Sequence, residues 1–199
     1  MKKILSFGVF AFLTCSLTFG AGYNVGDKAE DFRLQNIDGR YVSLADFPDA
    51  KGFIVAFTCN GCPYARAYQD RLIALDKKYK TKGYPVVAIN SNDVDLKPED
   101  SMEEMKQRAT EKGYTFPYLK DAKYEVFKAY GATRTPHIFL LEKEGGDLIV
   151  KYIGAIDDNY QDASAVQEDY LSNAVKALLA GKDPSPNETK AIGCTIKYK

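Results

Sequence analysis

The 199-residue sequence has no tryptophan, a single histidine and no excess of charge of either sign. Lysine plus arginine and aspartate plus glutamate number 27 each, and the pI lies near 6.6, which argues against a nucleic acid or another polyanion as partner. No internal repeat or low-complexity tract is present. Because 45% of the residues are hydrophobic, the composition suits one globular domain with a buried core.

Long apolar runs are absent except at the N-terminus. Lys2 and Lys3 precede an almost wholly apolar stretch, 4–19, and small residues follow at 20–22. The run is short and ends abruptly for a membrane span, and the pattern is typical of a secretory signal, with a retained membrane anchor as the alternative. We therefore expect 1–21 to be a signal segment and the protein to be periplasmic or otherwise exported, touching a membrane only if the segment is retained.

Cysteine is also scarce. Cys15 lies in the expected signal segment, which leaves Cys59, Cys62 and Cys194 in the mature chain. An odd number is not a structural disulfide framework, whereas a close pair and a third thiol suit cysteine chemistry. In an oxidising compartment the pair would be stored as a disulfide unless a partner reduces it.

Hydrophobic periodicity predicts alternating strands and helices. Residues 52–58 are apolar throughout, as in a strand covered on both faces, and after Pro63 the apolar residues recur at helical spacing up to Gly83. We predict an α/β fold, a central mixed β-sheet flanked by helices with an N-terminal β-hairpin extension, over 22–183, followed by a C-terminal tail, 184–199, that carries Cys194. We also expect a hairpin within 26–47 that turns at Asp38-Gly39, and further strands at 85–90, 115–119, 137–142 and 148–153. Three more helices are expected. One runs from a Ser101/Glu104 capping box to 112, one covers 124–130, and the last starts at a Ser164/Gln167 cap and includes Leu171, Val175 and Leu178.

The most informative motif is Cys59-Asn60-Gly61-Cys62, which stands between the expected strand and helix. Unpaired N–H groups at a helix start favour a thiolate over a thiol. We expect Cys59 to lie just before or at the helix start and to attack a partner's sulfur, and Cys62, one turn on, to resolve the mixed disulfide. The alternative is a structural disulfide or two core thiols.

Three stretches resemble the thioredoxin-like superfamily, in its branch of redoxin, peroxiredoxin-like (AhpC/TSA-type) and TlpA-like exported proteins. The resemblance covers 23–182 and implies the thioredoxin-like fold. It also implies that Pro136 is a cis-proline facing the dithiol and that Thr135 presents its backbone to an extended peptide, with an ordinary trans proline as the alternative. The stretches are Phe57-Thr58-Cys59-Asn60-Gly61-Cys62-Pro63, Thr133-Arg134-Thr135-Pro136 and the lead-in Gly26-Asp27-Lys28-Ala29-Glu30-Asp31-Phe32.

Four further residues are possible accessories to this site. Thr58 stands where thioredoxin has a tryptophan, and it either bonds the thiolate or only ends the strand. Arg134 is the candidate activating arginine of a peroxidase, and His137 either tunes the thiolate or is an ordinary strand residue. Cys194, in a tail similar to that of one peroxiredoxin-like subgroup, is a resolving thiol, a link to another molecule or inert. The preceding strand lacks the buried acid that many thioredoxins use as a proton acceptor.

The leading functional hypothesis is an exported thiol–disulfide oxidoreductase that uses a redox-active Cys59–Cys62 disulfide on protein or small-molecule disulfides. The alternatives are a peroxiredoxin-like thiol peroxidase with antioxidant activity and, less favoured, a copper-binding assembly factor resembling the Sco proteins. We expect no cofactor and no resident metal. The expected partners are protein thiols or disulfides, or a peroxide, together with an unidentified reductant or oxidant. The direction of electron flow stays open, because it depends on the hydrogen bonds around the thiols.

Overall fold

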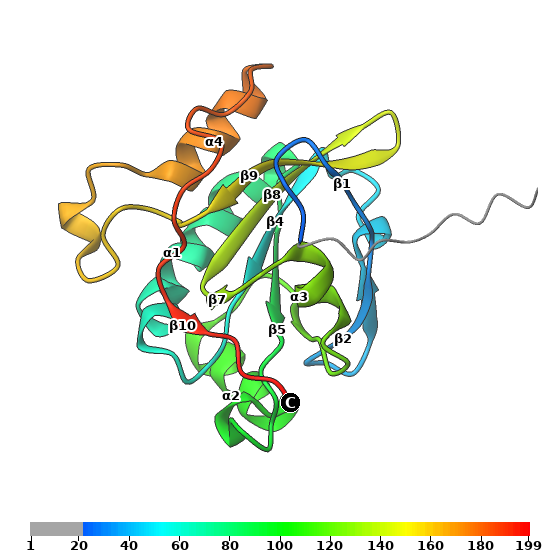
Figure 1. Ribbon diagram of the computed structural model, residues 1–199, viewed down its shortest axis with the longest axis vertical. Helices are drawn as coiled ribbons and strands as arrows, with labels where there is room; N and C mark the ends of the chain where they lie inside the picture. The colour runs from blue at the N-terminus through cyan, green and yellow to red at the C-terminus, as the bar shows by residue number, and fades with distance from the viewer. Residues whose placement is uncertain (1–21) are drawn as a thin grey trace, which may run out of the picture.

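The computed structural model describes residues 22–199, so the expected signal segment, 1–21, lies outside the described residues. An eight-stranded mixed sheet occupies the centre, in the order β1-β9-β8-β4-β5-β6-β2-β3, and a second, two-stranded sheet pairs β10 with β7 (Figure 1). The strands are β1 (Lys28–Ala29), β2 (Arg33–Asn36), β3 (Tyr41–Ser43), β4 (Gly52–Phe57), β5 (Val86–Asn90), β6 (Tyr118–Lys120), β7 (Arg134–Thr135), β8 (His137–Glu144), β9 (Asp147–Gly154) and β10 (Cys194–Thr195).

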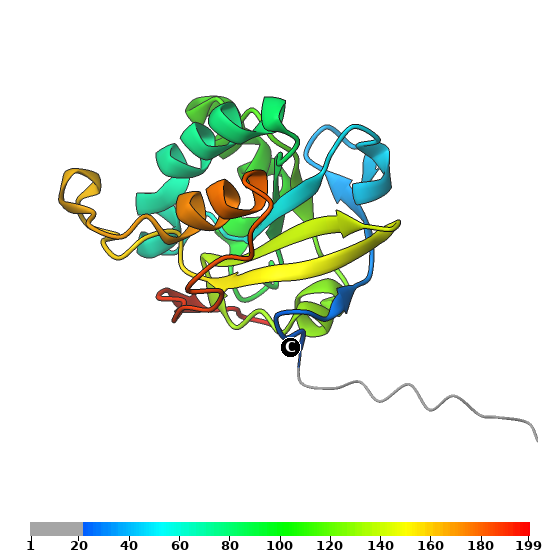
Figure 2. The same ribbon diagram turned by 90° about the horizontal axis from the view of Figure 1, so that it is seen from above.

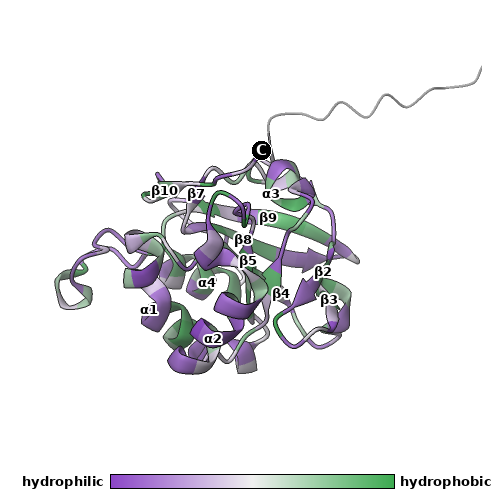
Figure 3. Ribbon diagram, turned by 90° about the horizontal axis from the view of Figure 1, so that it is seen from below, coloured by the Kyte–Doolittle hydropathy of each residue, from purple (hydrophilic) through white to green (hydrophobic). Residues whose placement is uncertain are grey.

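Helices cover both faces of the large sheet, as Figure 2 shows for α1 and α4 on one side and α3 on the other. The core on the first side joins α1, α2 and α4 to the sheet, and the core on the second side joins α3 and the N-terminal segment to it. Hydrophobic segments gather between the helices and hydrophilic ones lie along their outer sides (Figure 3). The helices are α1 (Pro63–Tyr79), α2 (Met102–Lys112), α3 (Glu125–Tyr130) and α4 (Tyr170–Leu179).

The continuous apolar runs form the centre of the sheet, as predicted. Every residue of β4 and of β5 is buried, and the two strands pair in parallel. Strand β8 pairs antiparallel with β4 on the other side, which places its first residue, His137, opposite Phe57 at the end of β4. This register brings the chain before β8, Thr135-Pro136, beside the loop that carries the two cysteines.

Most of the other expected elements are confirmed. The N-terminal hairpin β2–β3 and the β8–β9 hairpin both form, and Ser101 caps α2 by accepting a hydrogen bond from the Glu104 backbone N–H. The cap predicted for the last helix was wrong. Residues Ala163–Ala165 form a separate 3-10 turn, and α4 begins after Asp169, whose carboxylate accepts from the Ser172 backbone N–H.

The segment 184–199 folds back over the domain. Figure 1 shows it running from α4 past the start of α1 to β7, where β10 pairs with Cys194 opposite Thr135 and Thr195 opposite Arg134. Within 22–199, no helix is both long enough and apolar enough to cross a membrane.

Candidate redox site

The two expected cysteines lie in the turn from β4 to α1. Pro63 is the first residue of α1, where a missing N–H costs nothing and the fixed backbone angle suits a helix. Cys62 is therefore the N-cap residue, with extended backbone angles (φ −75°, ψ 125°), and Cys59 lies three residues before it. The helix start thus lies at Cys62, after which Pro63 begins α1, and Cys59 lies just before it, which is one of the two positions expected from the sequence.

Thr135 lies against both sulfur atoms. Its hydroxyl oxygen is 3.2 Å from the Cys59 Sγ, and its carbonyl oxygen is 3.2 Å from the Cys62 Sγ, where it accepts a hydrogen bond when Cys62 is protonated. The Thr135–Pro136 peptide bond is cis, as the resemblance implied. The thiols are buried, with 2% of Cys59 and 4% of Cys62 exposed.

The two thiols share a hydrogen bond, and their ionisation is divided unequally. This bond, then burial and the negative charge of Asp100, raise the pKa of Cys59. The same bond lowers the pKa of Cys62 to about 4, against the effect of burial, and donors from Cys194 and the Ala65 backbone N–H lower it further. The helix start and its N–H donors therefore favour the thiolate at Cys62, and Cys59 keeps the proton.

We expect the reduced protein to show one thiolate per chain at pH 6 to 7, lost near pH 4 on acidification, with the second ionisation only at alkaline pH. Thiolate absorbance near 240 nm measures this, and Cys62→Ser is the control that should lack the acidic transition. The pKa of Cys62 in the folded protein lies below its value of about 8.5 in the unfolded chain, so the Cys62 thiolate stabilises the reduced fold. This contribution is fully present above about pH 8.5 and is lost as the pH falls through about 4. Two ionisations above pH 8 and none near 4 would contradict the assignment.

A buried carboxylate, Asp100, holds the loop between the cysteines. Its Oδ1 accepts from the Asn60 backbone N–H at 2.7 Å and from the Asn90 side chain at 2.8 Å, and its Oδ2 accepts from the Asn92 side chain at 2.8 Å. The Lys120 ammonium donates to the backbone carbonyls of Asp100 at 3.0 Å and Asn92 at 2.6 Å. A buried acid thus lies near the pair on a loop distant in sequence, where no local sequence pattern marks it.

Asn60 and Gly61, the two residues between the cysteines, pack the loop against Glu99 and Tyr118. Asn60 donates to the Glu99 carbonyl at 2.8 Å and accepts from the Tyr118 hydroxyl at 3.1 Å. A Cβ on Gly61 would lie 2.3 Å from a Glu99 carboxylate oxygen, so this position admits only glycine unless Glu99 moves. The spacing between the cysteines is therefore held on both sides of the loop.

Three of the four accessory candidates, Thr58, Arg134 and His137, make no hydrogen bond to the sulfur atom of Cys59 or Cys62. Thr58 is buried and its backbone N–H extends the strand pairing to Ile89 at 2.8 Å. The Arg134 guanidinium is exposed and donates to the Gly193 carbonyl at 3.1 Å. Burial, and then Arg134, lower the pKa of His137 to about 4, and its Nδ1 accepts from the Thr133 backbone N–H at 3.3 Å, so the ring is neutral at pH 7. His137 is thus a strand residue beside the site.

The third cysteine, Cys194, lies at the site. Its backbone N–H donates to the Cys62 Sγ at 3.4 Å, and its side chain is also hydrogen-bonded to Cys62. Burial, followed by Cys62, raises the pKa of Cys194 to about 11. The structure thus places Cys194 against the pair. Among residues 22–199, no group of His, Cys, Asp and Glu has the arrangement of a metal site.

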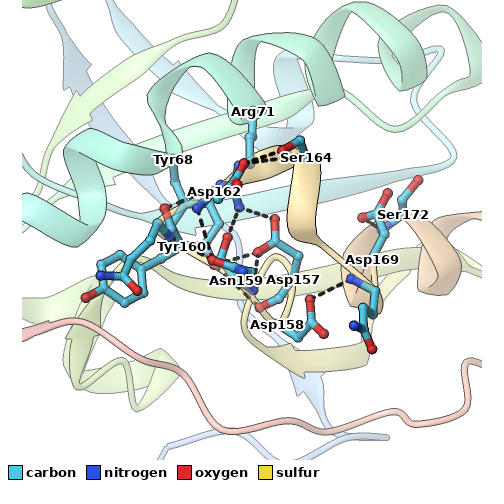
Figure 4. A network of polar contacts seen from close by, with 12 residues as sticks. Tyr68, Arg71, Asp157, Asp158, Asn159, Tyr160, Asp162, Ser164, Asp169 and Ser172 are labelled. Atoms are coloured by element: carbon cyan, nitrogen blue, oxygen red, sulfur yellow. Dashed lines mark hydrogen bonds and ion pairs between the residues drawn. The ribbon is translucent and has the colours of Figure 1, made fainter.

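Tyr64 packs against the two cysteines, and its ring centroid lies 4.3 Å from that of Tyr160; these two rings are called the rim of the site. Figure 4 shows how the loop that carries Tyr160 is tied to α1. The Arg71 guanidinium pairs with Asp157 at 2.6 Å and donates to the carbonyls of Asn159 and Tyr160. This partly buried network holds the rim in place and contains no redox-active group.

Comparisons with known proteins agree with this geometry. The sequence profile of the AhpC/TSA family matches residues 25–152. A curated relative, thiol-disulfide oxidoreductase ResA of Geobacillus thermodenitrificans, is 31% identical over 124 residues, which cover 61% of this chain and 65% of that protein, slightly less than two thirds of its length.

Solved structures of similar fold cover more of the chain. An uncharacterized conserved protein from Geobacillus kaustophilus has a TM-score of 0.80 and 41% identity, covering 88% of this chain and 93% of that one. A putative thiol:disulfide interchange protein DsbE from Chlorobium tepidum has a TM-score of 0.52 and 29% identity, covering 64% of this chain and 84% of that one. The α/β thioredoxin-like fold expected from the sequence is thereby confirmed.

Proposed function

Because the chain belongs to the AhpC/TSA family and has the thioredoxin-like fold, we propose that it is an exported thiol–disulfide oxidoreductase that acts on protein cysteines through the Cys59–Cys62 pair. The observation that carries the proposal is the contact of Thr135, next to a cis-proline, with both sulfur atoms. Export is supported by the pattern of 1–21, and disulfide exchange by the relatives named thiol-disulfide oxidoreductase.

The position of Cys62 at the start of α1 and the Cys194 N–H that donates to its sulfur support Cys62 as the attacking thiol. Since the thiolate is the nucleophile, Cys62 attacks a sulfur of the substrate disulfide, forming a mixed disulfide and releasing one substrate thiolate, which takes a proton. Cys59 then loses its proton, attacks the Cys62 sulfur and releases the second substrate thiolate. Two electrons pass to the substrate, and the Cys59–Cys62 disulfide remains. The reverse sequence oxidises a substrate dithiol.

The same hydrogen bonds favour the oxidising direction. Donors to the Cys62 sulfur stabilise the thiolate, which exists only in the reduced protein, and a stabilised reduced form makes the disulfide a stronger oxidant. A peroxidase is less consistent with the site, because Arg134, the candidate activating arginine, is directed at the Gly193 carbonyl.

We expect the Cys59–Cys62 couple to have a reduction potential less negative than about −270 mV, the value of thioredoxin. The full chain with Cys15→Ser and Cys194→Ser, equilibrated in glutathione redox buffers, measures the couple alone. In the same preparation, disulfides should form in a reduced unfolded protein, while hydrogen peroxide should be consumed no faster than by the additional variant Cys62→Ser. Rapid peroxide turnover without disulfide exchange would replace the proposal by the peroxidase alternative.

A further inference from the structure

The edge at which a substrate would pair is already occupied by the chain's own C-terminus. A strand-like peptide adds to an exposed edge through backbone pairing, and here β10 occupies the edge of β7, directly before Pro136. The register places Cys194 opposite Thr135, the residue that contacts both sulfur atoms. The docked segment thus presents a cysteine where the cysteine of a substrate would lie.

The segment is held by contacts on both sides of Cys194. Before it, the Gly193 carbonyl accepts from Arg134, and a Cβ at Gly193 would lie 2.2 Å from the Thr135 carbonyl oxygen. After it, Ile196 is buried in the core beside α3, and the Lys197 backbone N–H donates to the Asn92 side chain at 2.8 Å. These contacts fit a specific docked state and not a loosely attached tail.

We propose that the segment Gly193–Ile196 is an internal substrate of the dithiol, and that Cys194 forms a disulfide with Cys62 by exchange with the Cys59–Cys62 bond. This inference rests on the proposed function, because it takes the edge of β7 as the place where substrate peptides pair. The contacts that carry it are the bond from the Cys194 N–H to the Cys62 sulfur and the pairing of Cys194 with Thr135. External substrates then bind only when the segment leaves the edge.

The exchange balances without an outside oxidant. The Cys194 thiol loses its proton and attacks the Cys62 sulfur of the Cys59–Cys62 disulfide, the Cys62–Cys194 bond forms, and Cys59 leaves as a thiolate that takes up the proton. The number of disulfides is unchanged. The direction of the exchange is reversed when Cys59 attacks Cys62 again.

The test compares two single-cysteine replacements in the full chain, both with Cys15→Ser. On mild oxidation with diamide, Cys59→Ser is expected to form a Cys62–Cys194 disulfide within one chain at least about tenfold faster than Cys62→Ser forms a Cys59–Cys194 disulfide, because the tail contacts Cys62. Acid quenching, alkylation and non-reducing peptide mass mapping identify the bonds. Equal rates, or only bonds between chains, would overturn the inference.

A second arm tests docking without changing a cysteine. Gly193→Val is expected to displace the segment and to raise the rate at which a bulky maleimide labels Cys62 by at least about tenfold, whereas Lys190→Val, at an exposed position of the same segment, should leave it unchanged. Equal labelling in both variants would overturn docking. If Cys194→Ser still exchanges its Cys59–Cys62 disulfide with a small dithiol while both arms fail, only this inference fails and the proposed function stands.

Discussion

Replacing Cys59 with serine is expected to leave a chain that captures disulfide-bonded proteins covalently through Cys62, at least about a hundredfold faster than the Cys62→Ser chain captures them through Cys59. Capture requires a thiolate. In Cys62→Ser, burial and Asp100 still hold the pKa of Cys59 above its ordinary value, so less of it is ionised at neutral pH than of a free cysteine. The thiol that remains is thus mostly unreactive.

The opposite variant keeps its reactive form. Without Cys59, Cys62 loses one hydrogen bond but keeps the backbone donors from Ala65 and Cys194 and its place at the start of α1. Its pKa should rise from about 4 towards neutrality, which increases the intrinsic nucleophilicity of the thiolate while leaving it populated. No second thiol is left to release the substrate, so the mixed disulfide accumulates.

The measurement is the rate of mixed-disulfide formation between each reduced variant and a disulfide-bonded protein, followed on non-reducing gels after alkylation. Both variants carry Cys15→Ser and Cys194→Ser, which removes competition from the tail. Labelling in denaturant, where the two thiols should react alike, is the control for thiol content. Faster capture by Cys62→Ser would assign the attack to Cys59, as the sequence had predicted, and would reverse the roles derived from the structure.

The sequence and the structure lead to different proposed roles for the two cysteines, although the sequence located the pair correctly. The apolar run of β4 and the spacing of Cys59 and Cys62 were enough to place the pair between a strand and a helix. Pro63 marked where α1 begins, because proline is favoured at the first helical position, but the sequence left open whether Cys59 lies at that start or before it. The structure places Cys62 at the N-cap, and the proposed attack by Cys62 rests on that position.

The two remaining parts of the site depend on contacts between distant segments. Asp100 lies 40 residues from Asn60 in a polar stretch that looks like a surface loop, and only the packing of the chain makes it fully buried. Strand β10 has two residues, too few for a periodic pattern, and its pairing with β7 joins residues 59 positions apart. Sequence patterns describe local structure, whereas both of these features are set by tertiary packing.

Removing the carboxylate of Asp100 is expected to cost about 3–5 kcal/mol of the free energy of unfolding. Asp100→Ala leaves the Asn60 backbone N–H and the Asn90 and Asn92 side chains without their acceptor. An unpaired buried donor costs about 1–3 kcal/mol, so three of them exceed an ordinary core substitution even if water replaces some of the bonds. The ammonium of Lys120, 8% exposed, would also lose the nearest negative charge that compensates its burial.

Two comparisons separate this effect from a general loss of charge in the loop. Asp95→Ala removes a carboxylate whose side chain is 69% exposed and pairs only with Lys199 at the surface, so it should cost less than about 1 kcal/mol. Asp100→Asn keeps one oxygen acceptor but turns an NH2 group towards a neighbouring donor. Its loss of unfolding free energy should therefore lie between those of Asp95→Ala and Asp100→Ala. Urea denaturation of the reduced proteins gives these free energies.

The same variants test whether Asp100 acts on the thiols or only on the fold. Its negative charge raises the pKa of Cys59, so Asp100→Asn should shift the alkaline ionisation of the pair to lower pH while the Cys62 transition stays near 4. A purely structural residue would change the unfolding free energy and leave both ionisations in place. If Asp100→Asn moves neither, the carboxylate only supports the loop, and the protonation of Cys59 follows from burial and its hydrogen bond to Cys62 alone.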